Sequence, residues 1–130
     1  MTGKEGYKKL IVWQNAQKLR MLIYQMTATF PKAEMRRVSQ MRDAARSVKQ
    51  NIQEGYQRRS LGEYVRGLEI SKASLAELQG DVEDCHEDGV MSSALFNQAY
   101  DLCKKTDYLF ARLLQSLYRK RNVEGGRRSA

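Results

Sequence analysis

The 130-residue sequence contains one proline, two cysteines and one histidine. A single proline, Pro31, leaves room for long helices, because proline breaks a helix when it falls inside one. No run of about 20 apolar residues occurs, so no segment is expected to cross a membrane. Residues 1–9 are polar and lack the apolar core of a signal peptide. These features predict a soluble, cytoplasmic, helical protein with no membrane partner.

The scarcity of histidine and cysteine also argues against an enzyme. A ferritin-type metal site needs two Glu-x-x-His pairs, and Glu83 with His86 supplies only one. Glycine motifs that cradle phosphates are missing, and nothing links His86 to a nucleophile. Cys85 and Cys103 do not form a C-x-x-C pair. We expect both to be free thiols, because an antiparallel bundle would place them at different heights along its axis, too far apart for a disulfide. We therefore predict no catalytic residue, no metal and no cofactor.

Four segments repeat apolar residues at alternating steps of three and four, as helices with one buried face do. No segment alternates at period two, so strands are not expected. The connections are short, and short connections make neighbouring helices antiparallel. The sequence thus predicts an all-α, antiparallel, up-down-up-down four-helix bundle. Its apolar seams lie within residues 12–30, 35–52, 61–85 and 95–113.

Residues typical of helix ends separate these segments. Gly55 is the predicted left-handed cap of the second helix. Ser60 and Glu63 form a capping box that opens the third helix. Gly89 is the next predicted terminator, and one of the serines three and four residues further on is the predicted N-cap of the fourth helix.

The chain is long enough for one domain and leaves no room for a second core. Periodicity stops after residue 122. We therefore predict that residues 1–122 form the bundle and that residues 123–130 are a disordered basic C-terminal tail.

The fourth segment carries a second apolar stripe beside its seam, with a residue at every seventh position. Two stripes on one helix predict a contact between subunits, whereas a core filled by large side chains is the alternative. A polar stripe on the second segment includes Asn51 and Glu54, and it is either a solvated face, a subunit contact or a ligand groove. The residues assigned to an oligomer interface are Phe96, Cys103, Phe110, Leu117, Asn51 and Glu54.

The net charge of +8 favours acidic partners, and an antiparallel bundle would gather much of it at one end. Arginine is dense there, and its planar fork suits phosphate. Tyr7, Tyr56 and Tyr118 lie near these residues and are candidates for stacking on unpaired bases. A solvated basic surface is the alternative. The predicted nucleic-acid-binding residues are Lys8, Lys9, Arg58, Arg59, Arg119, Lys120, Arg121, Arg127 and Arg128.

The opposite end carries acids, which run through residues 77–88 without a lysine or arginine. Acids at a helix C-terminus oppose the helix dipole, so a compensating charge is expected. Lys32, Arg36 and Arg37 are predicted at the same end. They either neutralise the acids locally or leave a docking site for a basic partner.

Residues 7–14, 30–31, 39–42, 47–55 and 73–78 resemble the 23S rRNA-intervening-sequence proteins, also called the four-helix bundle protein family. The resemblance runs in register from about Tyr7 to Tyr118. It implies a bundle that assembles as a ring, typically a pentamer. It also implies kinship with the accessory variability proteins of diversity-generating retroelements, which bind a reverse transcriptase and nucleic acid. Two positions depart from the family pattern. Lys49 stands where the family usually has proline, and Asp43 stands where a basic or small residue is usual.

The leading hypothesis is a non-enzymatic, homo-oligomeric adaptor that binds RNA or DNA through its basic end, as an accessory to a reverse transcriptase. No base-reading motif is present, so phosphate contacts would dominate. The alternative is a protein-interaction scaffold that does not bind nucleic acid. A third, weaker hypothesis is a small-molecule binder that uses the polar stripe.

Overall fold

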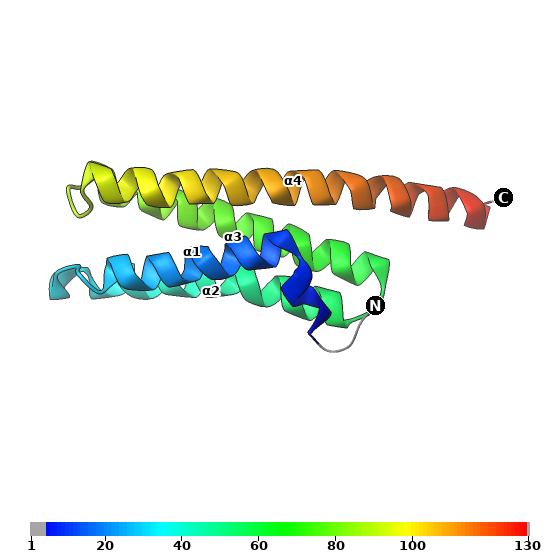
Figure 1. Cartoon of the computed structure of the whole chain (residues 1–130), viewed down its shortest axis with the longest axis horizontal. Coiled ribbons are helices and arrows are strands. Elements are labelled where there is room, and N and C mark those ends of the chain that lie inside the picture. Colours follow the sequence, from blue (N-terminus) through cyan, green and yellow to red (C-terminus); the bar gives the residue numbers. More distant parts are fainter. Residues whose placement is uncertain (1–4, 130) are drawn as a thin grey trace.

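The computed structural model describes the backbone of residues 5–129 and the side chains of residues 5–125. The described part is helical and contains no strand, as predicted. The four α-helices, α1 to α4, make up most of it (Figure 1). The elements in chain order are η1 (Gly6–Lys9), α1 (Ile11–Thr27), η2 (Lys32–Glu34), α2 (Met35–Gln57), α3 (Leu61–Glu87) and α4 (Ser93–Ser129).

Each long helix packs against two others. Helix α1 lies beside α2 and α4, and α3 lies beside the same two helices. Contacts between α2 and α3 run in opposite chain directions, because Arg37 meets Asp88 near one end and Ser47 meets Ser74 near the middle. The chain reverses at each turn (Figure 1). The ends of α2 and α4 and the start of α1 and α3 therefore share one end of the molecule.

The core is a continuous cluster of apolar side chains from all four helices. The predicted seam of α1 is confirmed, since every seam residue within that helix is buried. In α4 the buried line differs from the prediction. It combines Ala99 and Thr106 of the predicted seam with Cys103, Phe110 and Leu114 of the second stripe.

Three of the predicted helix-end signals are confirmed. The backbone N–H of Glu63 donates to Ser60 Oγ at 3.1 Å, and Ser60 Oγ donates to the Glu63 carboxylate at 3.2 Å. Gly89 has φ 74°, the left-handed conformation that glycine adopts without a steric penalty. The N–H of Leu95 donates to Ser92 Oγ at 3.2 Å, so Ser92 caps α4.

The prediction that Gly55 ends the second helix is wrong. Helix α2 continues to Gln57, and the residue with positive φ is Arg59, at 64°. Gly55 instead faces Gly67 of α3, where the two backbones approach closely. A Cβ added to Gly67 would lie 2.6 Å from the carbonyl oxygen of Asn51 and 2.9 Å from the Cα of Gly55. Gly55 therefore allows α2 and α3 to pack closely and does not form the turn after α2.

Helix α4 is longer than the sequence predicted. Its backbone continues to Ser129, through the segment 123–129 that we expected to be an irregular tail. The arginines, lysine and glutamate that precede Gly125 are good helix formers, and nothing before the end of the helix stops it. The last part of α4 projects beyond the other helices (Figure 1).

Both cysteines are free, as predicted, and both are buried. Burial raises the pKa of the Cys103 thiol to about 12, with smaller contributions from Asp107 and Glu83. Burial also raises the pKa of Cys85, although Arg37 opposes that shift. Thiols with raised pKa values remain protonated at neutral pH and are poor nucleophiles.

None of the described helices is long and apolar enough to cross a bilayer. Among residues 5–125 there is also no group of three or more histidine, cysteine, aspartate or glutamate side chains placed to hold a metal ion.

Candidate nucleic-acid interface

The predicted basic residues lie on three elements at one end of the molecule. Lys8 and Lys9 are in η1, Arg58 and Arg59 form the turn between α2 and α3, and residues 119–121 are in α4. All seven side chains are exposed. The backbones of residues 127 and 128 are in the last turns of α4, and their side chains lie outside the described residues.

A pocket at this end brings two of these cations together. We call it the basic-end pocket, and its cavity volume is about 340 Å³. Arg59 reaches it from the α2–α3 turn and Lys120 from α4. Most of its other lining is apolar or aromatic. The full lining is Leu10, Tyr56, Arg59, Ser60, Leu61, Tyr64, Leu117 and Lys120.

Two tyrosines form the aromatic part of the basic-end pocket. The rings of Tyr56 and Tyr64 meet edge to face, with centroids 5.6 Å apart. Burial, and to a lesser degree Tyr56, raises the pKa of Tyr64 to about 12, so this side chain is neutral at physiological pH. The hydroxyl of Tyr56 lies against Gly6, where an added Cβ would be 2.6 Å away. The glycine in η1 therefore lets the N-terminal segment close over the ring of Tyr56.

Arg59 has an unusual backbone conformation. A non-glycine residue in the left-handed region costs about 1–2 kcal/mol, so the turn holds this arginine at a cost in stability. Strain of this kind is often found where a side chain has a function. No pattern in the sequence indicates this strain, because the short distance between the end of α2 and the Ser60 cap is set by the packing of the two helices.

Other predicted residues at this end have partners within the chain. Lys8 forms an ion pair with Glu5 at 2.9 Å, which raises its pKa through a hydrogen bond and charge. The guanidinium of Arg121 lies 5.0 Å from the ring centre of Tyr118. The Tyr118 hydroxyl donates to Glu69 at 2.8 Å, and this hydrogen bond raises its pKa.

The expectation that Tyr7 stacks on bases is corrected by its burial. Only 9% of its surface is exposed, and its ring packs edge to face on Trp13 at 5.4 Å. Trp13 in turn donates from Nε1 to Gln53 at 2.8 Å. Tyr7 thus anchors η1 to the bundle, and of the three predicted tyrosines only Tyr56 lines the basic-end pocket.

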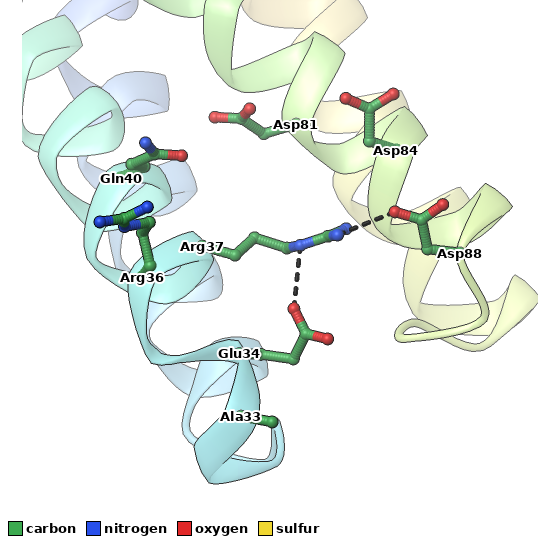
Figure 2. A pocket seen from close by; sticks show the side chains of 8 residues that line it. All are labelled: Ala33, Glu34, Arg36, Arg37, Gln40, Asp81, Asp84 and Asp88. Atoms are coloured by element: carbon green, nitrogen blue, oxygen red, sulfur yellow. Dashed lines mark hydrogen bonds and ion pairs between the residues drawn. The ribbon is translucent and has the colours of Figure 1, made fainter.

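The opposite end has its own pocket, of about 360 Å³, between the start of α2 and the end of α3 (Figure 2). Arg37 extends across it and pairs with Glu34 at 3.0 Å and Asp88 at 2.8 Å. Burial, followed by the charges of Glu77 and Asp84, raises the pKa of the nearby Asp81. The expected local neutralisation is therefore present at one carboxylate of the acidic run, that of Asp88, and Arg37 supplies it.

The residues predicted to form the oligomer interface differ in how exposed they are in the structure. Phe110 and Cys103 have no exposed surface, so they pack inside the chain and are corrected to core residues. Phe96 is half-buried and stacks on His86 at 4.2 Å. Asn51 is half-buried and donates to the carbonyl of Ser47 at 2.9 Å. Leu117 lines the basic-end pocket, and Glu54 is exposed.

Apolar surface is exposed elsewhere, along the contact between α1 and α4. Three hollows of about 400–440 Å³ lie there, and we call them together the α1–α4 groove. Ile11 is 61% exposed and Tyr108 59% exposed. This surface was not predicted from the sequence, although Ile11 and Tyr108 both lie outside the predicted seams. The apolar side chains that line the groove are Leu10, Ile11, Val12, Leu22, Leu102, Tyr108, Leu109 and Leu113.

These features define the class of the protein, which is a small all-α protein of four helices with a basic end. Residues 8–112 match the family described as 23S rRNA-intervening sequence protein. Because the match covers most of the chain, the protein belongs to that family. No curated protein matches the chain.

Proposed function

We propose that the protein is a non-enzymatic, cytoplasmic, homo-oligomeric adaptor, an antiparallel up-down-up-down bundle that binds nucleic acid through its basic end. One observation carries the proposal. The fold places Arg59 and Lys120, from separate elements, on one pocket, with Arg58, Arg119 and Arg121 exposed next to them in the chain. Phosphate contacts of exposed arginine and lysine supply most of the affinity of binding without sequence readout.

Assembly as a ring, with a pentamer as the expected state, rests on the resemblance to the family. If all subunits of such a ring point the same way, their basic ends share one face and their fields add. An accessory role for a reverse transcriptase has the same support. The exposed apolar α1–α4 groove favours self-association, because monomers rarely leave large apolar patches uncovered.

Removing four arginines tests the nucleic-acid proposal. We expect the combined variant Arg58→Ala, Arg59→Gly, Arg119→Ala and Arg121→Ala to bind duplex and single strands on the order of ten- to a hundredfold more weakly, irrespective of sequence. Glycine is used at position 59 because alanine would keep the backbone strain. The slope of log affinity against log salt should become shallower by up to about 0.9 per lost duplex phosphate contact, or about 0.7 for single strands. Fluorescence anisotropy across a salt series measures both.

The matched control is charge reversal of Lys32 and Arg36, which are exposed at the opposite end. It should leave binding almost unchanged. Arg37 is kept, because its ion pair with Asp88 links the start of α2 to the end of α3. Unchanged affinity after loss of the four arginines would show that the surface has been misplaced.

The alternative function is a protein-interaction scaffold. The carboxylates of Asp81, Asp84 and Asp88 in the acidic pocket favour it, because they would repel phosphate. The exposed apolar side chains of the α1–α4 groove also favour it, although Lys9 and Arg112 line the same groove. Failure to bind duplex DNA, single-stranded DNA and structured RNA at 50 mM salt, an ionic strength at which phosphate contacts are little screened, would leave the scaffold as the better proposal.

The oligomer proposal predicts a particle several times the mass of one chain in light scattering at micromolar concentration. The variant Ile11→Glu with Tyr108→Glu should dissociate it, because charges would be buried in an apolar contact. The control is Ile70→Glu, at a position on α3 that is 40% exposed and outside the groove. A single-chain mass for the unaltered protein would refute self-association, and dissociation by Ile70→Glu would move the contact to another face.

A further inference from the structure

We infer that the basic-end pocket receives one unpaired base of a bound strand, so that the protein prefers single-stranded to fully paired nucleic acid. The inference rests on the proposed nucleic-acid binding and adds to it the part of the ligand that is recognised. Phosphate contacts alone would not distinguish a strand whose bases are free from one whose bases are paired.

The lining of the pocket matches the two parts of a nucleotide. Leu10, Leu61 and Leu117 form apolar walls, and Tyr56 and Tyr64 add aromatic surface. Arg59 and Lys120 add two cations to the same lining. An apolar and aromatic interior suits the flat face of a base, while adjacent cations suit the phosphates that flank it.

The size of the pocket limits what can enter. Its volume of about 340 Å³ is at the lower end for small-ligand sites, which suits a single base and not a stacked pair. A base within a duplex would have to be unstacked and unpaired first, and this costs a few kcal/mol in general. A base in a single strand enters without that cost.

The chemistry of Tyr64 is consistent with this use. Its hydroxyl stays neutral at physiological pH, so the aromatic wall adds no negative charge next to the phosphates. Ser60 lines the pocket as well, but its hydroxyl is already engaged with Glu63 in the capping box. Recognition is therefore expected to depend on stacking and not on hydrogen bonds to base edges, which makes it tolerant of sequence.

Two labelled oligonucleotides test the inference. One is an eight-nucleotide oligothymidylate, and the other has the same backbone with an abasic site at every position. We expect the full-length protein to bind the intact strand about 5- to 150-fold more tightly, the range for stacking of one base on aromatic side chains. Both strands should show the same salt slope, because they carry the same phosphates. A duplex of equal length should resemble the abasic strand once its higher charge is allowed for.

Variants assign this preference to the pocket. Tyr64→Leu keeps an apolar filling and removes the ring, so the ratio of intact to abasic affinity should fall towards one. Leu117→Trp, which fills the cavity, should do the same and serves if the first variant folds poorly. Lys120→Gln should weaken both strands together and preserve the ratio. Tyr24→Leu, at an exposed tyrosine of α1 outside both this pocket and the α1–α4 groove, is the control and should leave the ratio unchanged.

The possible outcomes separate the two proposals. Equal binding of intact and abasic strands would overturn the base pocket and leave nucleic-acid binding in place. A preference that survives both Tyr64→Leu and Leu117→Trp would also overturn it, because the base would be held elsewhere. Failure to bind any strand would refute the proposed function itself. Repetition with oligouridylate shows whether the pocket accepts RNA as well as DNA.

Discussion

Replacing Phe110 by alanine is expected to lower the free energy of unfolding by about 3–5 kcal/mol, as removal of a fully buried aromatic ring typically does. Phe110 has no exposed surface and is the largest of the completely buried side chains. Its loss would leave a cavity in the middle of the core that the surrounding helices cannot fill. Because domains of this size have a total stability of about 5–15 kcal/mol, the variant should be close to unfolding at physiological temperature. Urea denaturation followed by circular dichroism measures the change.

A control on the same helix distinguishes core from interface. Tyr108, two residues earlier, is 59% exposed, and its replacement by alanine should change the stability of the isolated fold by less than about 0.5 kcal/mol. If Phe110→Ala instead kept its helical signal and its denaturation midpoint but ran as a smaller particle, Phe110 would be a subunit contact. The sequence alone left both roles open for this residue, and its burial within one chain assigns it to the core.

The helices and their core were largely predictable, because buried residues must recur with the helical period. In α1 the spacing of Val12, Ala16, Leu19, Ile23 and Met26 sufficed, and all five are buried. Helix α4 was harder, since its two adjacent apolar stripes offered two choices of inward face. The helix is oriented so that residues from the adjoining edges of both stripes are buried. Which face turns inward depends on the shape of the neighbouring helices, and one sequence does not contain that information in its spacing.

The candidate site was predictable only as a distribution of charge. Short turns decide which helix ends share an end of the bundle, so the gathering of Arg58, Arg59 and residues 119–121 followed from the order of the elements. The pocket did not follow. It depends on Leu10 and Tyr64, which approach Lys120 only through packing. For the same reason the sequence places Tyr7 at the surface, although its side chain is buried and its ring packs on Trp13.

Helix α3 offers a pair of glycines whose substitution should have opposite effects. Gly67→Ala is expected to destabilise the protein by about 3 kcal/mol, the upper part of the usual range for an overfilled core. The new Cβ would lie 2.6 Å from the Asn51 carbonyl oxygen and 2.9 Å from the Gly55 Cα, and both are backbone atoms that move only if α2 moves. Gly80→Ala meets nothing within 4 Å and should stabilise the helix by about 0.5–1 kcal/mol.

Thermal denaturation of the two variants compares these effects under identical conditions. Helix propensity favours alanine at both positions, so a lower melting temperature for Gly67→Ala must come from the contact with α2. Equal stabilisation by both substitutions would show that α2 and α3 can separate without cost. That result would also weaken the base pocket, because Arg59 and Ser60 hold their places in its wall only while the turn between these two helices is kept short by their close approach.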